Sequence, residues 1–461
     1  MPQVTWAPWW ASASVPVSVP VPVPASDSAR SFAPPSEALR ADSLSSLEAS
    51  TKFGRVLFAP IVSLTYNWCM FVRRNLASVL TRVSRQYPVV TVTGPRQSGK
   101  TTLCRHVFPR KPYINLERID DRGYAGSDPR GFLADHPDGA VLDEVQHAPD
   151  LLSYLQAEVD EDPRPGRWIL TGSEHFGLSG TVAQTLAGRT AVLHLLPLAI
   201  DELGRFADAP GDLFETLFSG GFPRIHDQAI PPGRWIGDYV QTYLQRDVRR
   251  LLAISDLEAL HTFMRLLAGR TAQELNLSGL GADAGVSHNT ARSWLSVLEA
   301  SFLVFRLPAW SRNPRKRLVK TPKIHWMDTG LVCYLLGIRS PAELKTHPLR
   351  GPIFESWVAA EVYKAHANRG LAPALSHLRQ PRGPEVDLLV DRGADVRGVE
   401  CKSGATVASD ALNALEGLAA ALGPAHPVGR GVLVYGGSSR QRRTHADIVP
   451  WNALAAVDWF G

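Results

Sequence analysis

Residues Thr93 to Leu103 read TGPRQSGKTTL, a stretch whose residue types and spacing suit the binding of a nucleotide phosphate. Glycines let a chain turn so that successive backbone N–H groups point inward at phosphate oxygens. A lysine in this pattern reaches the outer phosphates, and the following hydroxyl is offered to Mg²⁺. The stretch satisfies GxxxxGK[ST], so we expect an ATP site. Its expected cofactor-binding residues are Gly94, Pro95, Arg96, Gln97, Ser98, Gly99, Lys100, Thr101 and Thr102.

Hydrolysis needs a second acidic strand, and residues 139–144, GAVLDE, supply one about forty residues later. We expect Asp143 to hold Mg²⁺ together with Thr101, and Glu144 to orient and polarise the attacking water. The alternative is a salt bridge at the end of a strand. Another strand, from Trp168, ends in small hydroxyl residues, and Ser173 or Thr171 is expected to sense the outer phosphate.

Arg189, in the segment LAGRT, is a candidate for stabilising charge that develops on the transferred phosphate. It would act either in its own subunit or in a neighbouring one. Action on a neighbouring subunit would imply a homo-oligomer. A surface ion pair is an equally acceptable interpretation of this arginine.

The second group of chemical residues lies in residues 385–402, EVDLLVDRGADVRGVECK. This stretch predicts two strands joined by a turn around Gly393 and Ala394. With the turn centred there, Asp387 faces Glu400 and Glu385 faces Lys402, all on one face of the hairpin. Opposed carboxylates repel, and a bound cation relieves the repulsion. The spacing therefore predicts a metal site at Asp387 and Glu400.

This pair of strands resembles the core of the PD-(D/E)XK nucleases. The resemblance implies that Asp387 and Glu400 bind Mg²⁺ and that Lys402 steadies the nucleophile or the phosphate. Glu355 or Glu361, on the preceding helix, would complete the set. The first element reads EVD instead of PD, as in resolvase-like branches. In the competing interpretation, Lys402 only neutralises Glu385 or Glu400 on a solvent-exposed face.

Residues 280–295 resemble a helix-turn-helix, with Gly285 in the turn and Ser287 capping the second helix. One helical face would be buried, and the opposite face would read a DNA groove. The buried residues are expected to be Ala291, Trp294, Leu295 and Leu298, and the outward ones His288, Asn289, Arg292 and Ser293. Such units also serve purely as protein-packing modules, and that alternative stays open.

A basic cluster follows the helix-turn-helix, in a segment that we interpret as a β-wing. Its density of positive charge suits phosphate contacts, although a solvated loop has the same composition. The cluster consists of Arg312, Arg315, Lys316, Arg317, Lys320 and Lys323.

The elements that must position these residues are also visible in the sequence. Strand-forming residues 89–92 precede the glycine-rich stretch, and helix-forming residues 102–107 follow it. An amphipathic helix, MFVRRNLASVLTRV, leads into this strand. In residues 235–248, Ile236, Tyr239, Val240, Tyr243 and Leu244 recur at helical spacing, which favours a stripe that faces the core.

Taken in order, several segments resemble the prokaryotic AAA+ family ATPases that carry a C-terminal domain of unknown function 4143. The segments are TGPRQSGKTTL, VLDEVQ, ILTGSEHFGLS, LAGRT with LPLAIDEL, GGFPRI, YVQTYLQRDV, KIHWMDTGLVCYLLG, FESWVAAEV and EVDLLV with VECKSG. The resemblance covers about residues 70–440. It implies an ATPase joined to a DNA-type module.

Length and composition set the limits of this interpretation. A chain of 461 residues exceeds one ordinary core, and a formal charge of +5 permits nucleic-acid binding without requiring it. The four cysteines are scattered without a CxxC pair, which argues against a disulfide framework and structural zinc and favours the reducing cytoplasm. A mostly apolar run, residues 56–72, contains Pro60, Thr65 and Asn67, so a membrane tether is the weakest alternative.

We therefore expect an α/β chain with a P-loop (AAA+) parallel sheet covered by helices on both faces. A helical and winged-helix segment would follow, and then a restriction-endonuclease-like α/β domain. The expected boundaries are 1–68 (disordered, proline-rich), 69–205 (ATPase), 206–270 (helical linker), 271–340 (winged helix) and 341–461 (nuclease-like). The expected function is an ATPase coupled to a DNA-binding, Mg²⁺-dependent nuclease-like domain. The alternative is a non-cutting regulator that ATP switches and that binds DNA or protein.

Overall fold

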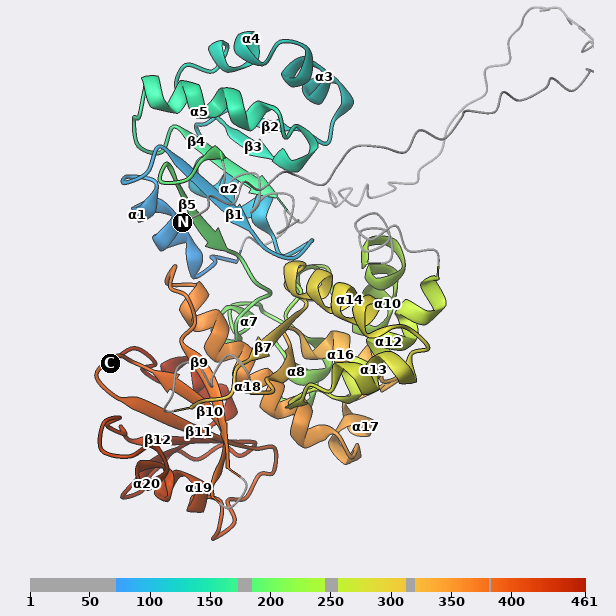
Figure 1. The fold of residues 1–461 in the computed structure, drawn as a ribbon, viewed down its shortest axis with the longest axis vertical. Helices are drawn as coiled ribbons and strands as arrows, with labels where there is room; N and C mark the ends of the chain where they lie inside the picture. Colours follow the sequence, from blue (N-terminus) through green and yellow to red (C-terminus); the bar gives the residue numbers. More distant parts are fainter. Residues whose placement is uncertain (1–71, 173–184, 245–255, 312–319, 381–382) are drawn as a thin grey trace, which may run out of the picture. The chain divides into compact units, whose positions relative to one another are not determined.

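The computed structural model describes residues 72–172, 185–244, 256–311, 320–380 and 383–461 (Figure 1). Several expectations fall outside these ranges: the disordered head 1–68, the apolar run before residue 72, Ser173, and four residues of the basic wing. Those four are Arg312, Arg315, Lys316 and Arg317. Within the described ranges, no helix combines the length and the apolar character needed to cross a bilayer.

The first domain is built on a parallel sheet with the strand order β2-β3-β4-β1-β5. Its strands are β1 (Val89–Thr93), β2 (Tyr113–Asn115), β3 (Val141–Asp143), β4 (Trp168–Gly172) and β5 (Thr190–His194). Residues of β1, β3 and β4 are buried throughout, as the near-continuous apolar runs of parallel sheets require. The predicted P-loop strand is therefore confirmed, one residue longer than expected.

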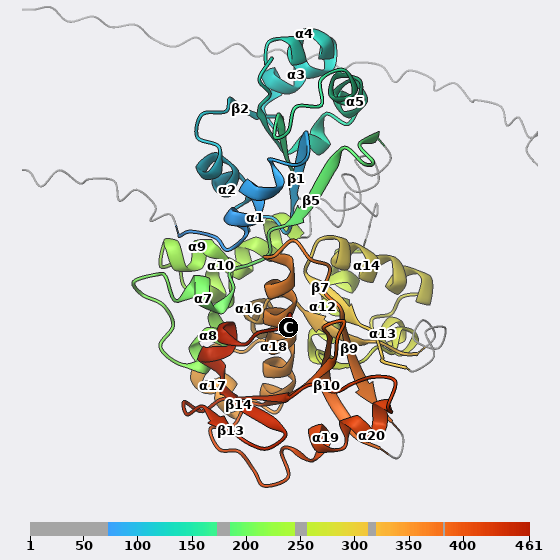
Figure 2. The same cartoon turned by 90° about the vertical axis from the view of Figure 1, so that its left-hand side faces the viewer.

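Helices cover both faces of this sheet (Figures 1 and 2). α1 (Leu76–Val83) and α2 (Lys100–Val107) pack with Val90, Val92 and Ile169. The opposite face, with Val89, Trp168 and Leu170, is covered by α3 (Ile119–Ser127), α4 (Pro129–Ala134) and α5 (Leu151–Glu161). Alternate residues of one strand thus serve two separate cores, because successive side chains of a strand point to opposite faces.

The middle segment is helical, as expected. It contains α7 (Ile200–Leu203), α8 (Leu213–Ser219), α9 (Pro223–Asp227), α10 (Pro232–Tyr239), a π-helical turn (Val240–Leu244) and α12 (Leu257–Gly269). Ile236, Tyr239 and Val240 are buried, which confirms the described part of the predicted apolar stripe. The side chains of Tyr243 and Leu244 lie outside the described residues.

Two helices and a small antiparallel sheet follow. The helices are α13 (Leu277–Asp283) and α14 (His288–Ala300), and the strands β6 (Gln273–Glu274), β7 (Val304–Leu307) and β8 (Lys323–Trp326) lie in the order β6-β8-β7. Gly285 takes a φ of +71° in the turn, and the Ser287 hydroxyl accepts a bond from Thr290 N at 3.1 Å. The predicted buried and exposed faces of α14 are both observed.

The C-terminal segment begins with α16 (Thr329–Leu335), α17 (Pro341–Thr346) and the long α18 (Arg350–Ala367). A mixed sheet follows, with the order β13-β14-β12-β11-β10-β9. Its strands are β9 (Leu375–Arg379), β10 (Glu385–Asp391), β11 (Val396–Lys402), β12 (Gly431–Tyr435), β13 (Gln441–Arg442) and β14 (Ala446–Pro450). The helices α19 (Asn413–Glu416) and α20 (Leu418–Leu422) lie between β11 and β12 in the chain, and a 3-10 turn (Trp451–Ala456) follows β14.

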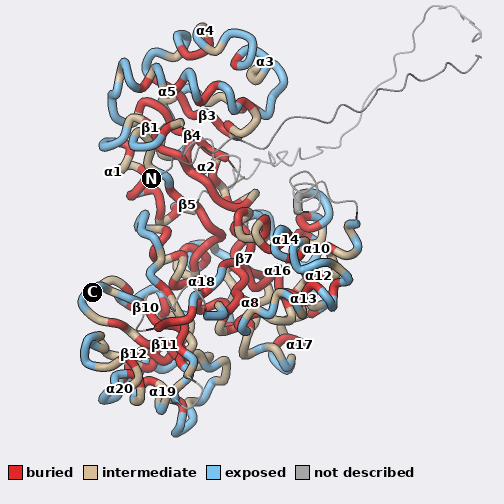
Figure 3. The backbone as a smooth tube through the Cα atoms, viewed as in Figure 1, coloured by how far each residue is buried: buried red, intermediate tan, exposed pale blue. Residues whose placement is uncertain are grey.

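α18 packs on one face of this sheet, and α19 and α20 pack on the other (Figure 2). A single buried cluster extends from Leu213 in α8 to Trp459 near the C-terminus. Buried residues occur in both the middle segment and the C-terminal sheet (Figure 3). The middle and C-terminal segments thus share one hydrophobic core.

Candidate functional site

The loop between β1 and α2 has the backbone geometry that its glycines predict. Gly94 has a φ of +151°, Gln97 of +60° and Gly99 of +94°. A Cβ atom on Gly94 would lie 2.1 Å from the backbone oxygen of Leu195, so a side chain has no room there. α2 begins directly after Gly99, at Lys100, which directs the helix N-terminus at the loop.

Lys100 is buried, and its ammonium group is enclosed by this loop. Its Nζ donates to the Gly94 oxygen at 3.1 Å and to the Pro95 oxygen at 2.8 Å. Burial lowers the pKa of Lys100 to about 8, although the carboxylates of Glu144 and Asp143 favour the charged form. A phosphate in the loop would supply the negative charge that this buried cation needs.

Asp143, at the end of β3, is the acceptor for three hydroxyl groups. Thr101 Oγ1 donates to it at 2.8 Å, Tyr113 OH at 2.6 Å, and Thr171 Oγ1 also donates. The Thr101 hydroxyl and the Asp143 carboxylate thus lie side by side, and this donor set fits the Mg²⁺ of a bound nucleotide. Sequence reasoning missed Tyr113, because a tyrosine in a short strand carries no motif.

Glu144 follows Asp143 in a left-handed backbone conformation, with φ 55° and ψ 47°. Its backbone N–H donates to Thr171 Oγ1 at 3.4 Å, and its carboxylate accepts from the side chain of Gln146. Such a conformation is costly for a non-glycine residue and is concentrated at functional sites. Thr171 thus contacts both acidic residues.

Arg189 lies at the opposite end of the strands from the P-loop, just before β5 begins. Its carbonyl oxygen accepts from Val89 N, at the start of β1, whereas the loop follows the end of that strand. Its guanidinium pairs with Asp160 at 2.5 and 2.7 Å. The structure therefore does not bring Arg189 to the P-loop of its own chain, and action on a neighbouring subunit stays a prediction.

In the C-terminal sheet, the predicted strand register is confirmed. In the antiparallel pair of β10 and β11, Leu388 lies opposite Val399 and Asp391 lies opposite Val396. The same register, continued by one residue, places Asp387 opposite Glu400. One Asp387 oxygen accepts from Cys401 N at 2.9 Å, and Glu400 pairs with Lys402 at 2.7 Å. The last contact agrees with the competing interpretation of Lys402.

The two helix residues proposed to complete this set lie in different places. Glu355 belongs to the carboxylate cluster, since Glu355 and Asp387 both lie within 4.0 Å of the Lys323 ammonium nitrogen, and the charge of Asp387 helps to raise the pKa of Glu355. Glu361 instead accepts from Ile200 N at 2.8 Å and pairs with Lys364. Two turns of α18 separate them, so only Glu355 belongs to the cluster.

Lys323 corrects one expectation. It was assigned to an exposed basic wing, but it lies in β8, is 3% exposed, and pairs with Glu355 at 2.9 Å. Glu385 lies 3.5 Å and Asp387 3.9 Å from the same ammonium nitrogen. The sequence pattern missed this because only folding brings the start of β8 beside the carboxylates.

The metal site expected at Asp387, Glu400 and Glu355 stays a prediction. Among the described residues, no group of three or more His, Cys, Asp or Glu side chains is suitably placed to hold one. Burial and neighbouring carboxylates raise the pKa of Glu355 to about 8 and of Glu400 to about 7. Glu355 pairs with Lys323, and Glu400 pairs with Lys402.

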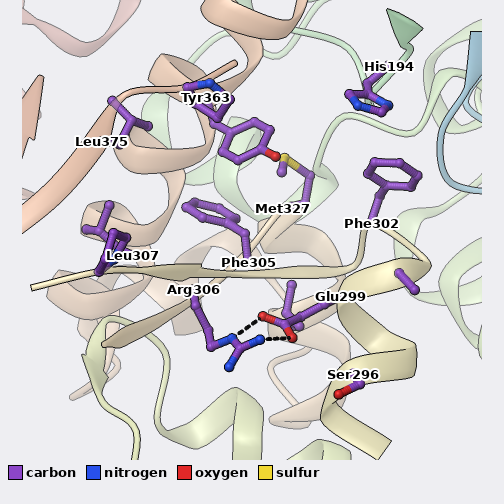
Figure 4. A pocket seen from close by; sticks show the side chains of 14 residues that line it. His194, Ser296, Glu299, Phe302, Phe305, Arg306, Leu307, Met327, Tyr363 and Leu375 are labelled. Atoms are coloured by element: carbon purple, nitrogen blue, oxygen red, sulfur yellow. Dashed lines mark hydrogen bonds and ion pairs between the residues drawn. The ribbon is translucent and has the colours of Figure 1, made fainter. Parts of the chain in front are cut away.

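A separate pocket of about 610 Å³ lies between β7, α14 and α18 (Figure 4). Phe302, Phe305, Met327 and Tyr363 contribute apolar surface to it. Its charged residues, Glu299 and Arg306, satisfy each other in a two-bond ion pair at 2.5 and 2.9 Å. The pocket contains none of the predicted site residues.

Three family models match the chain. An AAA domain matches residues 86–204, a domain of unknown function (DUF8612) residues 210–342, and another (DUF4143) residues 350–454. The first and third agree with the predicted ATPase and C-terminal segments. The second spans both the expected helical linker and the expected winged helix.

Two mycobacterial proteins are similar to most of the chain. They are the uncharacterized proteins Mb2031c of Mycobacterium bovis and Rv2008c of Mycobacterium tuberculosis. Each is 30% identical over 353 residues, which cover 73% of this chain and 76% of theirs. An uncharacterized protein of Haemophilus influenzae is 25% identical over 214 residues, 43% of this chain and 52% of that protein.

Solved structures with some similarity include the Walker-type ATPase PABY2304 of Pyrococcus abyssi. It is 16% identical with a TM-score of 0.39, over 57% of this chain and 96% of that one. Cdc6p from Pyrobaculum aerophilum is 17% identical with a TM-score of 0.24, over 52% and 86%. With the P-loop, the domain matches and the mycobacterial relatives together, the chain belongs to the family of AAA-type ATPases that carry a C-terminal DUF4143 domain.

Proposed function

We propose that this chain binds and hydrolyses ATP at residues 94–102 and uses the nucleotide state to control its binding to DNA. The observation that carries the first part is Lys100, a buried cation enclosed by a glycine-rich loop, to which no acidic side chain of the described residues is hydrogen-bonded. Such a group is stable only with a charge partner, and an ATP phosphate is the partner that fits the surrounding N–H groups.

In this proposal, each residue has a defined task. The loop amides and Lys100 hold the β- and γ-phosphates, while Thr101 and Asp143 hold Mg²⁺. Glu144 orients the attacking water, and Thr171 keeps Asp143 and the backbone of Glu144 in place. The bound Mg²⁺ supplies charge neutralisation of the phosphates.

Purified Lys100→Ala protein should lose ATP turnover by at least a hundredfold, because the cation that meets the outer phosphates is removed. Lys345→Ala, an exposed lysine on α17, is the matched control and should keep wild-type turnover. Phosphate release would be measured for both. Unchanged turnover in Lys100→Ala would refute the proposed site.

The DNA-binding part rests on α13, α14 and the small sheet. Along the chain the elements follow as α12, β6, α13, α14, β7 and β8, and the three strands form an antiparallel sheet in the order β6-β8-β7. This arrangement resembles a winged helix. Exposed His288, Asn289, Arg292 and Ser293 lie on the outer face of α14, which supports groove contact. Packing against a protein partner is the alternative for the same face.

Arg292→Ala should weaken binding to duplex DNA about tenfold, as expected for a lost base or phosphate contact. Arg234→Ala is the control, since Arg234 is an exposed helix arginine that pairs with an aspartate on α10. Fluorescence anisotropy with labelled duplexes, with ADP or a non-hydrolysable ATP analogue, would measure both. Equal losses in the two variants would argue against α14 as the DNA-binding element.

For the C-terminal domain, we favour the non-cutting interpretation. The order of α18, antiparallel β9, β10 and β11, and then β12 parallel to β11 resembles the PD-(D/E)XK core. However, Lys323 pairs with Glu355 among the carboxylates that would bind the metal, and within the described ranges no group of three or more His, Cys, Asp or Glu side chains is placed to hold one. In this interpretation the domain keeps the fold and has lost the cleavage chemistry.

Nuclease activity is the second candidate, and one observation favours it. The Oε2 atom of the buried Glu400 has no hydrogen-bond partner within the described ranges, although it lies opposite Asp387. Plasmid, branched and single-stranded DNA should be incubated with the protein and Mg²⁺ or Mn²⁺, with and without ATP. Cutting that disappears in Asp387→Asn would establish the second candidate; absence of cutting agrees with the first.

A further inference from the structure

Arg74, two residues before α1 begins at Leu76, is a buried cation in direct contact with the P-loop. It is 5% exposed, and its Nη1 donates to the carbonyl oxygen of Ser98 at 2.6 Å. Its Nη2 donates to the oxygen of Leu196 at 2.7 Å. One guanidinium therefore joins the phosphate loop to the segment that follows β5.

The bond to Ser98 sets the orientation of one peptide unit in the loop. In a trans peptide, the carbonyl of Ser98 and the N–H of Gly99 point in opposite directions. With the carbonyl held toward Arg74, the Gly99 N–H is directed away from Arg74. Gly99 itself has a φ of +94°, so its own backbone does not impose this orientation.

Glu202 on α7 fixes Arg74 from the other side. Its carboxylate is fully buried, lies 3.1 Å from Arg74 Nε, and accepts from Asn75 N at 2.6 Å and Ala199 N at 2.9 Å. Burial alone would raise the pKa of Glu202, but the charge of Arg74 and these N–H groups hold it below its ordinary value. Arg74 is thus held by the carboxylate of Glu202 on one side and donates to the neutral carbonyl of Ser98 on the other.

A neighbouring arginine, Arg205, offers a comparison for the contact between Arg74 and the P-loop. Arg205 also joins the two segments, since it donates to Asn75 Oδ1 at 2.5 Å and to Asp201 Oδ2 at 2.7 Å. It is partly exposed and has no bond to the P-loop among its contacts. The two arginines therefore secure the same junction, and only Arg74 reaches the loop.

We propose that Arg74 is a positioning residue for the nucleotide, which holds the Ser98–Gly99 peptide so that its N–H meets a phosphate oxygen. This inference rests on the proposed ATP site and adds to it a residue outside the GxxxxGK[ST] pattern. Arg74 touches no substrate; it acts through Ser98, and Glu202 keeps it in place.

Arg74→Lys is the decisive variant, because it keeps a cation beside Glu202 but lacks the planar fork that reaches Ser98 and Leu196 together. Its melting temperature without nucleotide should remain near that of the wild type. Its affinity for a fluorescent ATP or ADP analogue should fall roughly tenfold, the loss expected for one hydrogen bond to a charged group. The rise in melting temperature on adding ATP should shrink accordingly.

Arg205→Lys is the matched control and should bind nucleotide like the wild type. Normal nucleotide affinity in Arg74→Lys would overturn the inference, and so would an equal loss in Arg205→Lys, which would indicate a general weakening of the junction. Arg74→Met combined with Glu202→Gln removes both charges and covers the case in which Arg74→Lys does not fold. Failure of the ATP site itself is separate, because it would appear as identical binding by the wild type and Lys100→Ala.

Discussion

At the scale of single residues, the chemistry depends on buried charges and on what lies beside them. Among the described residues, the hydrogen-bond partners of Lys100 are the backbone carbonyls of Gly94 and Pro95, whereas Lys323 donates to the carboxylate of Glu355. Both are lysines buried near carboxylates, yet the pKa of Lys100 is lowered by burial and that of Lys323 is raised because its carboxylate partners outweigh burial. The same residue type therefore indicates a ligand site in one domain and a closed ion pair in the other.

Lys323→Met should destabilise the protein by about 3–5 kcal/mol, because it leaves buried carboxylates without their cation. Adding Glu355→Gln should restore part of the loss. Urea denaturation would measure both, with Lys320→Met as the control at an exposed site. A loss below about 1 kcal/mol would mean that water or ions reach the cluster and that Lys323 is not its principal cation.

His325 and His377 predict a loss of stability in acid. Both are fully buried, and burial, aided by the charge of Lys323, lowers the pKa of His325 to about 3 and of His377 to about 4. Below the ordinary value near 6.5, the unfolded chain therefore binds protons that the folded chain does not. Stability is complete above that pH and falls as the pH drops toward 4.

For each of these histidines, the loss between pH 7 and pH 5 should be about 2 kcal/mol. His325→Phe should remove its share, because the ring nitrogens of His325 have no hydrogen-bond partner within the described ranges and its ring stacks on Phe305. Urea midpoints at the two pH values would measure this, with the exposed His445→Phe as control. An unchanged pH dependence in His325→Phe would contradict the assignment.

At the scale of elements, backbone geometry limits what the P-loop accepts. Gly94→Ala would bring a Cβ atom within 2.1 Å of the Leu195 oxygen, so β1 and the segment after β5 would have to separate. We expect loss of nucleotide binding and a lower melting temperature. Gly123→Ala, in α3 with no heavy atom within 4 Å of the added Cβ, should leave both unchanged or raise stability slightly. Normal nucleotide binding in Gly94→Ala would show that the loop can move.

Elements also account for the confirmed and the missed expectations. The β10–β11 register followed from the position of the turn, because pairing in a hairpin is local. α14 formed as expected because its cap and its apolar face lie within a few residues of each other. In contrast, the side on which Arg189 lies depended on the direction of β5 relative to β1, which no local pattern reveals.

At the scale of the whole molecule, α18 connects the C-terminal carboxylates with the segment that follows the ATPase sheet. Near one end it carries Glu355, and near the other Glu361 accepts from Ile200 N and Lys364 Nζ donates to the Leu198 oxygen at 3.0 Å. Leu198 lies two residues after Leu196, which Arg74 contacts. These hydrogen bonds, together with the backbone of residues 196–198, connect the P-loop to α18.

Replacing both charges, Glu361→Leu with Lys364→Met, should preserve folding because an apolar pair can substitute for a buried ion pair. It should also preserve ATP turnover while abolishing the difference in DNA affinity between the ADP and ATP states. Anisotropy in both nucleotide states would measure this. Replacement of the exposed Arg234–Asp238 pair is the control, and a retained nucleotide effect in the α18 variant would show that the coupling takes another route.

By itself, the sequence determined the P-loop, the acidic strand end, the helix pair and the hairpin with Asp387 opposite Glu400. Each of these depends on residues close together in the chain, whose backbone conformations and side-chain alternation follow from local rules. Only the tertiary structure decided that Lys323 enters the carboxylate cluster, that Arg74 holds the loop, and that Arg189 lies away from it. These contacts join residues separated by 24 positions or more, and burial alone makes their charges matter, because water would screen the same charges at the surface.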